Sequence, residues 1–265
     1  MSSGQVTQPQ AEIDSAAAQD ELTLKQQEAI DKEISSTIPL VGDRECVTNL
    51  LPEYESDLVY KDKILEISKT YEFFRRMRPD GNCFFRAFCY GSIERVLGNP
   101  GAIQEYRDRL VASKDILKAT GFTQFTVEDF YDTFLDVLDK AAEGLAANEL
   151  LKLFQEQSLA DYLVVYLRIL TSAELRKSAE FYSNFIEGDR TLEEFCQLEV
   201  EPMYKESDHI HITALTTALG VGVKVIYMDR GLGGQHEFPD PENIAPAIYL
   251  LYRPGHYDIL YPKGT

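Results

Sequence analysis

The feature that most constrains the fold is the order in which helical and strand patterns follow one another. Apolar residues recur at helical spacing through much of the segment between residues 103 and 219. Runs rich in β-branched and aromatic residues then take over at 223–228, 247–252 and 257–261. Between the last two runs, Pro254-Gly255 suits the centre of a type II turn, so we expect a C-terminal hairpin. Helices followed by an antiparallel set of strands predict an α+β fold.

Local signals place individual helices within the middle segment. Thr126, three residues before Asp129, predicts the start of one helix. Residues 162–170 are apolar on nearly every side, which predicts a buried central helix. Ser207 or Asp208 is expected to cap a further helix, which Gly220 should end.

The first 42 residues differ in composition from the rest of the chain. They are rich in Ala, Gln, Ser and Glu and contain no aromatic residue. Residues 1–18 cannot bury enough apolar surface to offset the entropy of ordering, so we expect them to be disordered. Residues 20–35 are mostly helix formers with few apolar anchors, and they either form a helix against a partner or remain a solvated tail. We therefore predict an N-terminal arm over 1–42 and one folded domain over 43–265.

The charge balance limits the classes of partner. Lys and Arg number 26 and Asp and Glu number 44, which gives a formal net charge of -18. Nucleic acids and anionic membranes are bound by basic side chains, so neither is expected as a partner. A protein partner with a basic face is the better electrostatic match for this acidic chain. Arg75, Arg76 and Arg78 form the one basic cluster, which we expect to be a solvated face.

The cysteines and the apolar runs indicate the cellular compartment of the protein. Cys46, Cys83, Cys89 and Cys196 include no C-x-x-C pair, so we expect reduced thiols and no structural zinc site. Cys89 and Cys196 have the surroundings of core residues. Residues 1–19 lack the apolar centre of a secretory signal, and the longest apolar stretch is about half as long as a spanning helix. These features predict a cytoplasmic or nuclear protein.

The segment around Cys83 is a candidate nucleophile site. A dense turn cluster, 79–82, leads into an apolar run able to form a helix, which places Cys83 in the first helical turn with Asn82 or Asp80 as its cap. Unpaired amides and the positive end of the helix dipole favour a thiolate there. The same amides could hold an oxyanion during acyl transfer. The alternative is a small buried cysteine beside two phenylalanines.

A candidate base lies at the other end of the domain. His256 begins the last strand, and Asp258 points to the same face because residues two apart in a strand do so. A carboxylate on one ring nitrogen fixes the tautomer and leaves the other nitrogen free to act as a base. The alternative is a surface histidine with an incidental aspartate.

Two other motifs are weaker. Residues 208–211, Asp-His-Ile-His, offer two imidazoles, but positions two apart on a helix diverge, so we do not expect a metal site. The glycines at 231–234 lack the final glycine of a dinucleotide fingerprint, because His236 stands there, and predict a loop.

Both candidate segments resemble a known family. Residues 79–87, PDGNCFFRA, together with 252–260, YRPGHYDIL, are similar to the catalytic motifs of the ovarian-tumour (OTU) family of deubiquitinases. The stretches 161–168, DYLVVYLR, and 206–211, ESDHIH, resemble its otubain branch. The resemblance runs from about residue 43 to 262.

The resemblance implies a papain-like cysteine protease fold, with helices around a small, mostly antiparallel sheet. It implies hydrolysis of ubiquitin isopeptide bonds, with Cys83 as nucleophile, His256 as general base and acid, and Asp258 as orienting group. The backbone amides of Asp80, Gly81 and Cys83 would form the oxyanion hole, which places Asp80 among the catalytic residues. No metal or organic cofactor is implied.

The resemblance also suggests partners. Ubiquitin and polyubiquitin are the expected ligands, with a preference for lysine-forty-eight-linked chains to which the arm contributes, and we expect a monomer. The alternative is a non-catalytic inhibitor that binds ubiquitin-conjugating enzymes, and the two functions can coexist. A general papain-like peptidase ranks last because no secretory signal is present.

Overall fold

The computed structural model describes residues 26, 33–34, 36–122, 124–231, 234–238 and 244–264. The chain divides into two units, Met1–Pro39 and Leu40–Thr265. In the first unit, residues 33–34 and 36–37 are helical; the predictions for 1–18 and for most of 20–35 lie outside the described residues. The arm boundary predicted at residue 42 falls inside the first strand, since Leu40 and Val41 are already buried in the second unit.

Six strands form one sheet in the order β1-β2-β6-β5-β3-β4. Their bounds are β1 Val41–Cys46, β2 Tyr71–Met77, β3 Gly222–Tyr227, β4 Gly234–Phe238, β5 Pro246–Arg253 and β6 His256–Pro262. Among the described pairings, β3 with β5 is parallel and the other four are antiparallel. The predicted hairpin of β5 and β6 is confirmed: Arg253 pairs with His256, and Gly255 has a φ of 74° as a type II turn requires.

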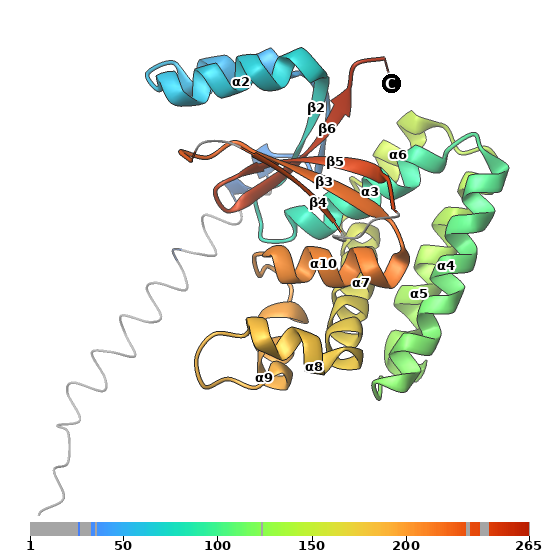
Figure 1. The fold of residues 1–265 in the computed structure, drawn as a ribbon. Helices are drawn as coiled ribbons and strands as arrows, with labels where there is room; N and C mark the ends of the chain where they lie inside the picture. The colour runs from blue at the N-terminus through green and yellow to red at the C-terminus, as the bar shows by residue number, and fades with distance from the viewer. Residues whose placement is uncertain are drawn as a thin grey trace, which may run out of the picture. The chain divides into compact units, whose positions relative to one another are not determined.

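Helices cover both faces of the sheet (Figure 1). Their bounds, with the short 3-10 and π segments η1 to η3, are η1 Val47–Tyr54, α2 Leu58–Thr70, α3 Cys83–Val96, α4 Pro100–Ala119, α5 Gln124–Ala142, α6 Ala147–Leu153, α7 Gln157–Lys177, α8 Ala179–Tyr182, η2 Ser183–Phe185, α9 Leu192–Phe195, η3 Cys196–Val200 and α10 His209–Leu219. No helix among the described residues is both long and apolar enough to cross a membrane.

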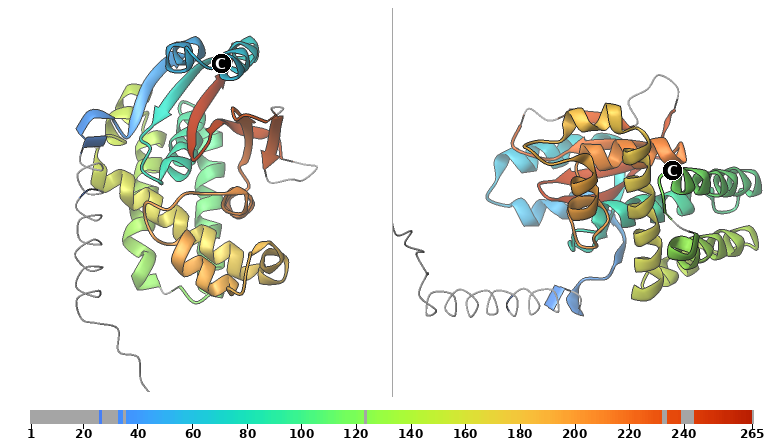
Figure 2. Two further views of the ribbon diagram at one scale, coloured as in Figure 1. Left: turned by 90° about the vertical axis from the view of Figure 1, so that its left-hand side faces the viewer. Right: turned by 90° about the horizontal axis from the view of Figure 1, so that it is seen from below.

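The sheet separates two apolar cores. Side chains alternate along a strand, so Leu250 and Ile259 join the core with α3, α4, α5, α7 and α10, while Leu251 and Leu260 join the core with η1 and α2. The long helices α4 and α5 lie side by side and α5 packs against α7 (Figure 2). The α+β class is thereby confirmed.

Most helix predictions are confirmed, and one needs a correction. Residues 162–170 lie in the buried helix α7, and Gly220 ends α10 with a φ of 60°. The helix expected from Thr126 begins earlier, since α5 starts at Gln124. Cys89 and Cys196 are buried, as expected.

Two strands, β1 and β2, come before the helices α3 to α10, contrary to the predicted order. The interpretation of the basic cluster as a solvated face is wrong for Arg75. Arg75 lies on β2 and is 7% exposed. Its guanidinium donates to the Tyr261 hydroxyl at 2.9 Å, to the Gly42 carbonyl at 2.8 Å and to the Glu94 carboxylate at 3.2 Å. A buried charge persists when partners of this kind compensate its desolvation.

Candidate active site

Cys83 is the first residue of α3 and is 4% exposed. Its position in the first helical turn is as predicted, but the expected cap is not formed by a side chain. Asn82 occupies the N-cap position, yet its Oδ1 accepts from the Tyr204 amide at 3.0 Å instead of from the first turn of the helix. Asp80 Oδ1 accepts from the Asn82 amide at 3.0 Å, so the two side chains shape the loop before Cys83.

Gly81 is the position in this loop that requires glycine. Its φ is 74°, in the left-handed region that side chains disfavour. A Cβ there would lie 2.3 Å from the carbonyl oxygen of Tyr204. The segment before α10 therefore packs directly against the nucleophile loop.

Arg168 ties these two segments together from inside the protein. It lies on α7 and is fully buried. Its guanidinium donates to the Gly81 carbonyl at 2.9 Å and to Asn82 Oδ1 at 2.9 Å. It also donates to the carbonyls of Val200 at 3.0 Å and Lys205 at 2.7 Å. Burial lowers the pKa of Arg168 to about 10, so the group stays charged at neutral pH.

A second buried arginine holds Asp80. Arg86 of α3 donates through Nη1 to Asp80 Oδ1 at 3.0 Å and through Nη2 to Asp80 Oδ2 at 2.7 Å. The two parallel bonds fix the carboxylate in direction as well as position. The Asp80 amide donates to the Arg78 carbonyl at 3.0 Å. The hydrogen bonds of the described residues leave the amides of Gly81 and Cys83 unused.

The β5–β6 hairpin brings His256 to this loop. The helix α3 packs on β6, and the ring of Phe84, next to Cys83, lies 5.7 Å from that of Tyr257, next to His256. His256 Nε2 is 2.8 Å from Asp258 Oδ1, so the two side chains share a face of the strand as predicted. His256 Nδ1 is buried and has no hydrogen-bond partner among the described residues.

The charges around His256 favour its protonated form. Burial lowers the pKa of His256, but the Asp258 carboxylate and Cys83 beside the ring outweigh burial and raise the pKa to about 9. Burial raises the pKa of Asp258, yet the hydrogen bond and charge of His256, with Arg253, bring it below its usual value. The structure thus assembles a thiol, an imidazole and a buried carboxylate.

Three arginines at this site escaped the sequence analysis: Arg86, Arg168 and Arg253. One signal was available for Arg168, which is the one charged residue within the apolar stretch 162–170. A charged side chain in an otherwise apolar helix is buried only where polar groups compensate its charge. Its presence in the sequence therefore indicates a polar site inside the protein.

The other candidate sites do not assemble a metal centre. The two histidines at 208–211 diverge: His211 is buried and accepts from the Asp208 amide, whereas His209 Nε2 is 2.6 Å from the Tyr227 hydroxyl. Among the described residues, no group of three His, Cys, Asp or Glu side chains could hold a metal ion.

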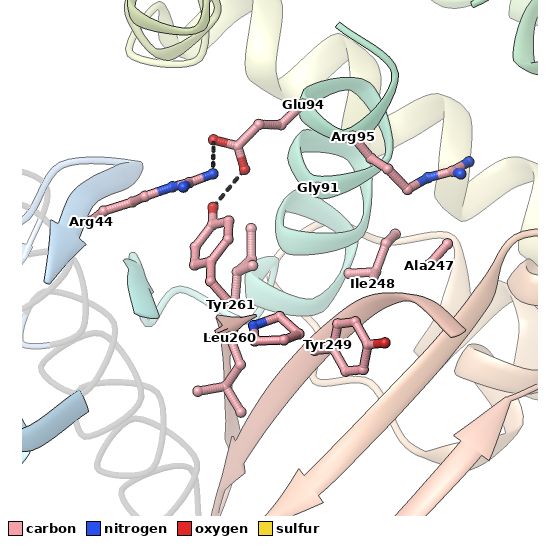
Figure 3. Close-up of a pocket in the computed structure, with 11 residues that line it drawn as sticks. Arg44, Gly91, Glu94, Arg95, Ala247, Ile248, Tyr249, Leu260 and Tyr261 are labelled. Carbon is pink, nitrogen blue, oxygen red and sulfur yellow. Dashed lines mark hydrogen bonds and ion pairs between the residues drawn. The ribbon is translucent and has the colours of Figure 1, made fainter. Parts of the chain in front are cut away.

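A cavity of about 270 Å³ lies between α3 and the β5–β6 hairpin and contains neither Cys83 nor His256. At its polar end Glu94 accepts from the Tyr261 hydroxyl at 2.6 Å and pairs with Arg44 at 3.4 Å (Figure 3). These partners, with Arg75, satisfy the Glu94 carboxylate, so the cluster joins β1, α3 and β6 as a structural element.

Comparison with known proteins identifies the family. Residues 33–262 match the family model for peptidase C65, otubain. Ubiquitin thioesterase OTUB1 of Homo sapiens is 49% identical over 248 residues, covering 92% of this chain and 91% of the relative. The ovarian tumour domain-containing deubiquitinating enzyme 1 of Arabidopsis thaliana is 40% identical, covering 92% of this chain and 87% of the relative.

Comparison with solved structures gives the same family. An OTUB1 chain determined with ubiquitin aldehyde and ubiquitin-linked UBC13 matches with a TM-score of 0.87 and 35% identity, covering 93% of this chain and 99% of that chain. Ubiquitin thioesterase OTUB2 of Homo sapiens is 36% identical and covers 84% of this chain, so the sequence is more similar to the OTUB1 relative. The resemblance inferred from the motifs is confirmed: the chain belongs to the otubain family of ubiquitin-directed cysteine peptidases, and it has the OTU fold.

Proposed function

We propose that this enzyme hydrolyses isopeptide bonds in polyubiquitin with Cys83 as nucleophile, His256 as acid and base, and Asp258 as orienting group. The observation that carries the assignment is the His256 ring, which is 13% exposed, contacts Asp258 Oδ1 through Nε2 and lies beside Cys83. A thiol nucleophile, a base and a group that orients the base are the parts that acyl transfer needs.

In the first half of the reaction, the Cys83 thiolate attacks the carbonyl carbon of the terminal glycine of ubiquitin. A C–S bond forms, and the carbonyl electron pair moves onto oxygen. The unused amides of Gly81 and Cys83 donate to this oxyanion; the Asp80 amide could join them once its bond to Arg78 opens. The C–N bond then breaks as the His256 imidazolium gives its proton to the lysine amine.

In the second half, neutral His256 removes a proton from water, and the hydroxide attacks the thioester carbon. The C–S bond breaks, which returns Cys83 as thiolate opposite the His256 imidazolium and releases the ubiquitin carboxylic acid, which ionises. Asp258 stays ionised throughout and stabilises the imidazolium.

We also propose that a groove beside α10 contacts the protein substrate. A cavity of about 610 Å³ is lined by residues of α8, η2, α9 and α10. On its rim Phe181 and Phe185 are 56% and 59% exposed. Large exposed aromatic side chains in one patch are typical of a protein contact. Aromatic contacts run from His209 at the groove through Tyr227 and Tyr252 to Tyr257, beside His256.

This part of the proposal is tested with Phe185→Ala. We expect a higher KM for a ubiquitin C-terminal amide and an unchanged rate of alkylation of Cys83 by iodoacetamide, because the site itself is intact. Leu198→Ala, which truncates another exposed apolar side chain outside the groove, is the matched control. Equal effects of the two substitutions on KM would refute the assignment of the groove.

We further propose a preference for lysine-forty-eight-linked chains, to which the N-terminal arm contributes. The family resemblance supports this proposal. The test compares cleavage of di-ubiquitins of each linkage by the full chain and by a chain lacking residues 1–39. This deletion keeps Leu40, Val41 and the Gly42 carbonyl that Arg75 binds. Equal rates on all linkages would refute the preference.

A second function, inhibition of ubiquitin-conjugating enzymes by binding, is favoured by one observation. Similar chains have been solved with ubiquitin-linked UBC13 and with ubiquitin-linked UBCH5B. If this enzyme binds such partners, Cys83→Ala will still inhibit chain synthesis by a purified conjugating enzyme, whereas removal of residues 1–39 will abolish inhibition. Loss of inhibition in Cys83→Ala alone would refute the binding function.

A further inference from the structure

The Asp258 carboxylate has hydrogen-bond partners in addition to His256. Its Oδ1 accepts from the Met77 amide at 2.9 Å in addition to contacting His256. Its Oδ2 accepts from Arg253 Nη2 at 2.6 Å. The Asp258 side chain is fully buried and that of Arg253 is 17% exposed. The carboxylate that orients the histidine is therefore itself half of a largely buried ion pair.

The opposite end of Arg253 connects the site to the start of the domain. Arg253 Nη1 donates to Glu53 Oε2 at 3.3 Å, on η1. Glu53 Oε1 pairs with Arg76 of β2 at 2.5 Å, and Arg76 Nε donates to Glu45 of β1 at 2.9 Å. A chain of alternating charges thus runs from Asp258 across η1 and β2 to β1.

We propose that Arg253 is a positioning residue that sets both the direction of the Asp258 carboxylate and the basicity of His256, and that Glu53 moderates its charge. The proposal rests on the roles proposed above for Cys83, His256 and Asp258. Arg253 itself touches no reacting atom.

The physical argument has two parts. By binding Oδ2, Arg253 leaves Oδ1 as the oxygen that faces His256 Nε2. Its positive charge also offsets part of the Asp258 charge that His256 senses, so the imidazolium is less stable than beside an unpaired carboxylate. Removing Arg253 should raise the pKa of His256. Removing the charge of Glu53 should lower it, because Arg253 then acts unopposed.

Other charged or titratable groups face the same ring or its partners, and within each experiment below every compared variant carries the same residue at these positions. Cys83 faces His256 from α3, and Tyr54 faces Arg253 from η1. From the segment before α10, the Glu206 carboxylate lies 3.4 Å from where a Cβ of Gly255 would be. Differences between variants therefore report on the Arg253–Glu53 pair.

The experiment measures the pKa of His256 by NMR of its ring protons in full-length Cys83→Ala protein, where the chain has 4 histidines to resolve. In this background we add Arg253→Met, Arg253→Lys or Glu53→Gln. Arg253→Met should raise the pKa by about one unit, Glu53→Gln should lower it by roughly a few tenths, and Arg253→Lys, which keeps the charge, should stay near the parent. Arg107→Met, which breaks the distant Arg107–Asp139 pair, is the control and should change nothing.

With Cys83 restored, the alkaline limb of the pH profile of kcat/KM should move in the same directions. The proposal requires opposite shifts for Arg253→Met and Glu53→Gln; the absence of either shift, or two shifts of one sign, overturns it. If Arg253→Met does not fold, Glu53→Gln alone tests the proposal. A lower pKa of His256 supports it, and an unchanged pKa refutes it. The NMR result does not depend on catalysis, so failure of the proposed function, seen as activity surviving Cys83→Ala, is distinguished from failure of this inference.

Discussion

The substitution Arg168→Met should destabilise the enzyme and disorganise its nucleophile loop. The guanidinium supplies hydrogen bonds to four acceptors: the carbonyls of Gly81, Val200 and Lys205, and Asn82 Oδ1. Methionine fills similar space but donates nothing, so these buried groups lose their charged donor. At roughly 1 kcal/mol for each unsatisfied acceptor, the free energy of unfolding should fall by about 3–5 kcal/mol.

Chemical denaturation measures this loss directly. Arg176→Met is the matched control, because Arg176 lies on the same helix and its side chain is 20% exposed beside Glu193 and Glu201. A partly solvated ion pair contributes little, so the control should lose about 1 kcal/mol or less. Arg168→Lys keeps the charge but cannot reproduce the planar fork, and it should lose most of the stability that Arg168→Met loses.

The same substitution should reduce activity in the fraction that stays folded. The loop that Arg168 binds carries Cys83 and the two unused amides, and a displacement of about 1 Å at a reacting group can cost roughly a hundredfold in rate. The reasoning would be refuted if Arg168→Met unfolded within 1 kcal/mol of the parent enzyme and reacted with a ubiquitin electrophile at the parent rate.

Three further predictions concern the loop and the histidine. Gly81→Ala should cost about 2–4 kcal/mol of unfolding free energy, because its Cβ would collide with the Tyr204 backbone; Gly121→Ala, also at positive φ but in open space, should cost clearly less, and equal midpoints in denaturant would contradict this. Asp258→Asn should lower kcat for a ubiquitin amide about a thousandfold or more, since the neutral amide no longer stabilises the imidazolium; a loss under tenfold would contradict it. The folded-state pKa of His256 is raised to about 9 from 6.5, so the stabilisation it gives is complete below pH 6.5 and is lost as the pH rises through 9. The difference in unfolding free energy between the parent and His256→Gln should shrink over that range, and a difference that grows with pH would have the wrong sign.

The sequence was most informative where the cause of structure is local. Pro254-Gly255 sets the hairpin through its own dihedral preferences, and the period-two spacing places His256 and Asp258 on one face. The apolar character of 162–170, interrupted by Arg168 alone, likewise predicted the buried part of α7. None of these inferences needed a distant partner.

The predictions that failed depended on distant partners. The basic cluster at 75–78 gave no sign that Arg75 would be buried, because its compensating groups, Gly42, Glu94 and Tyr261, lie on other elements. Asn82 was expected to cap its own helix, but Tyr204 and Arg168 occupy its side chain instead. Proximity of Cys83 and His256 could be suggested by family motifs alone, since no local pattern links positions so far apart.

The central claim, that Cys83 is the nucleophile for ubiquitin, is tested most directly by intact mass after mixing the enzyme with ubiquitin that carries a C-terminal electrophile. The cysteines of the chain allow a matched control, because Cys46 is exposed whereas Cys89 and Cys196 are buried. We predict one ubiquitin adduct on the parent enzyme and on Cys46→Ala, and none on Cys83→Ala. An adduct that persists in Cys83→Ala, or that disappears in Cys46→Ala, would contradict the account.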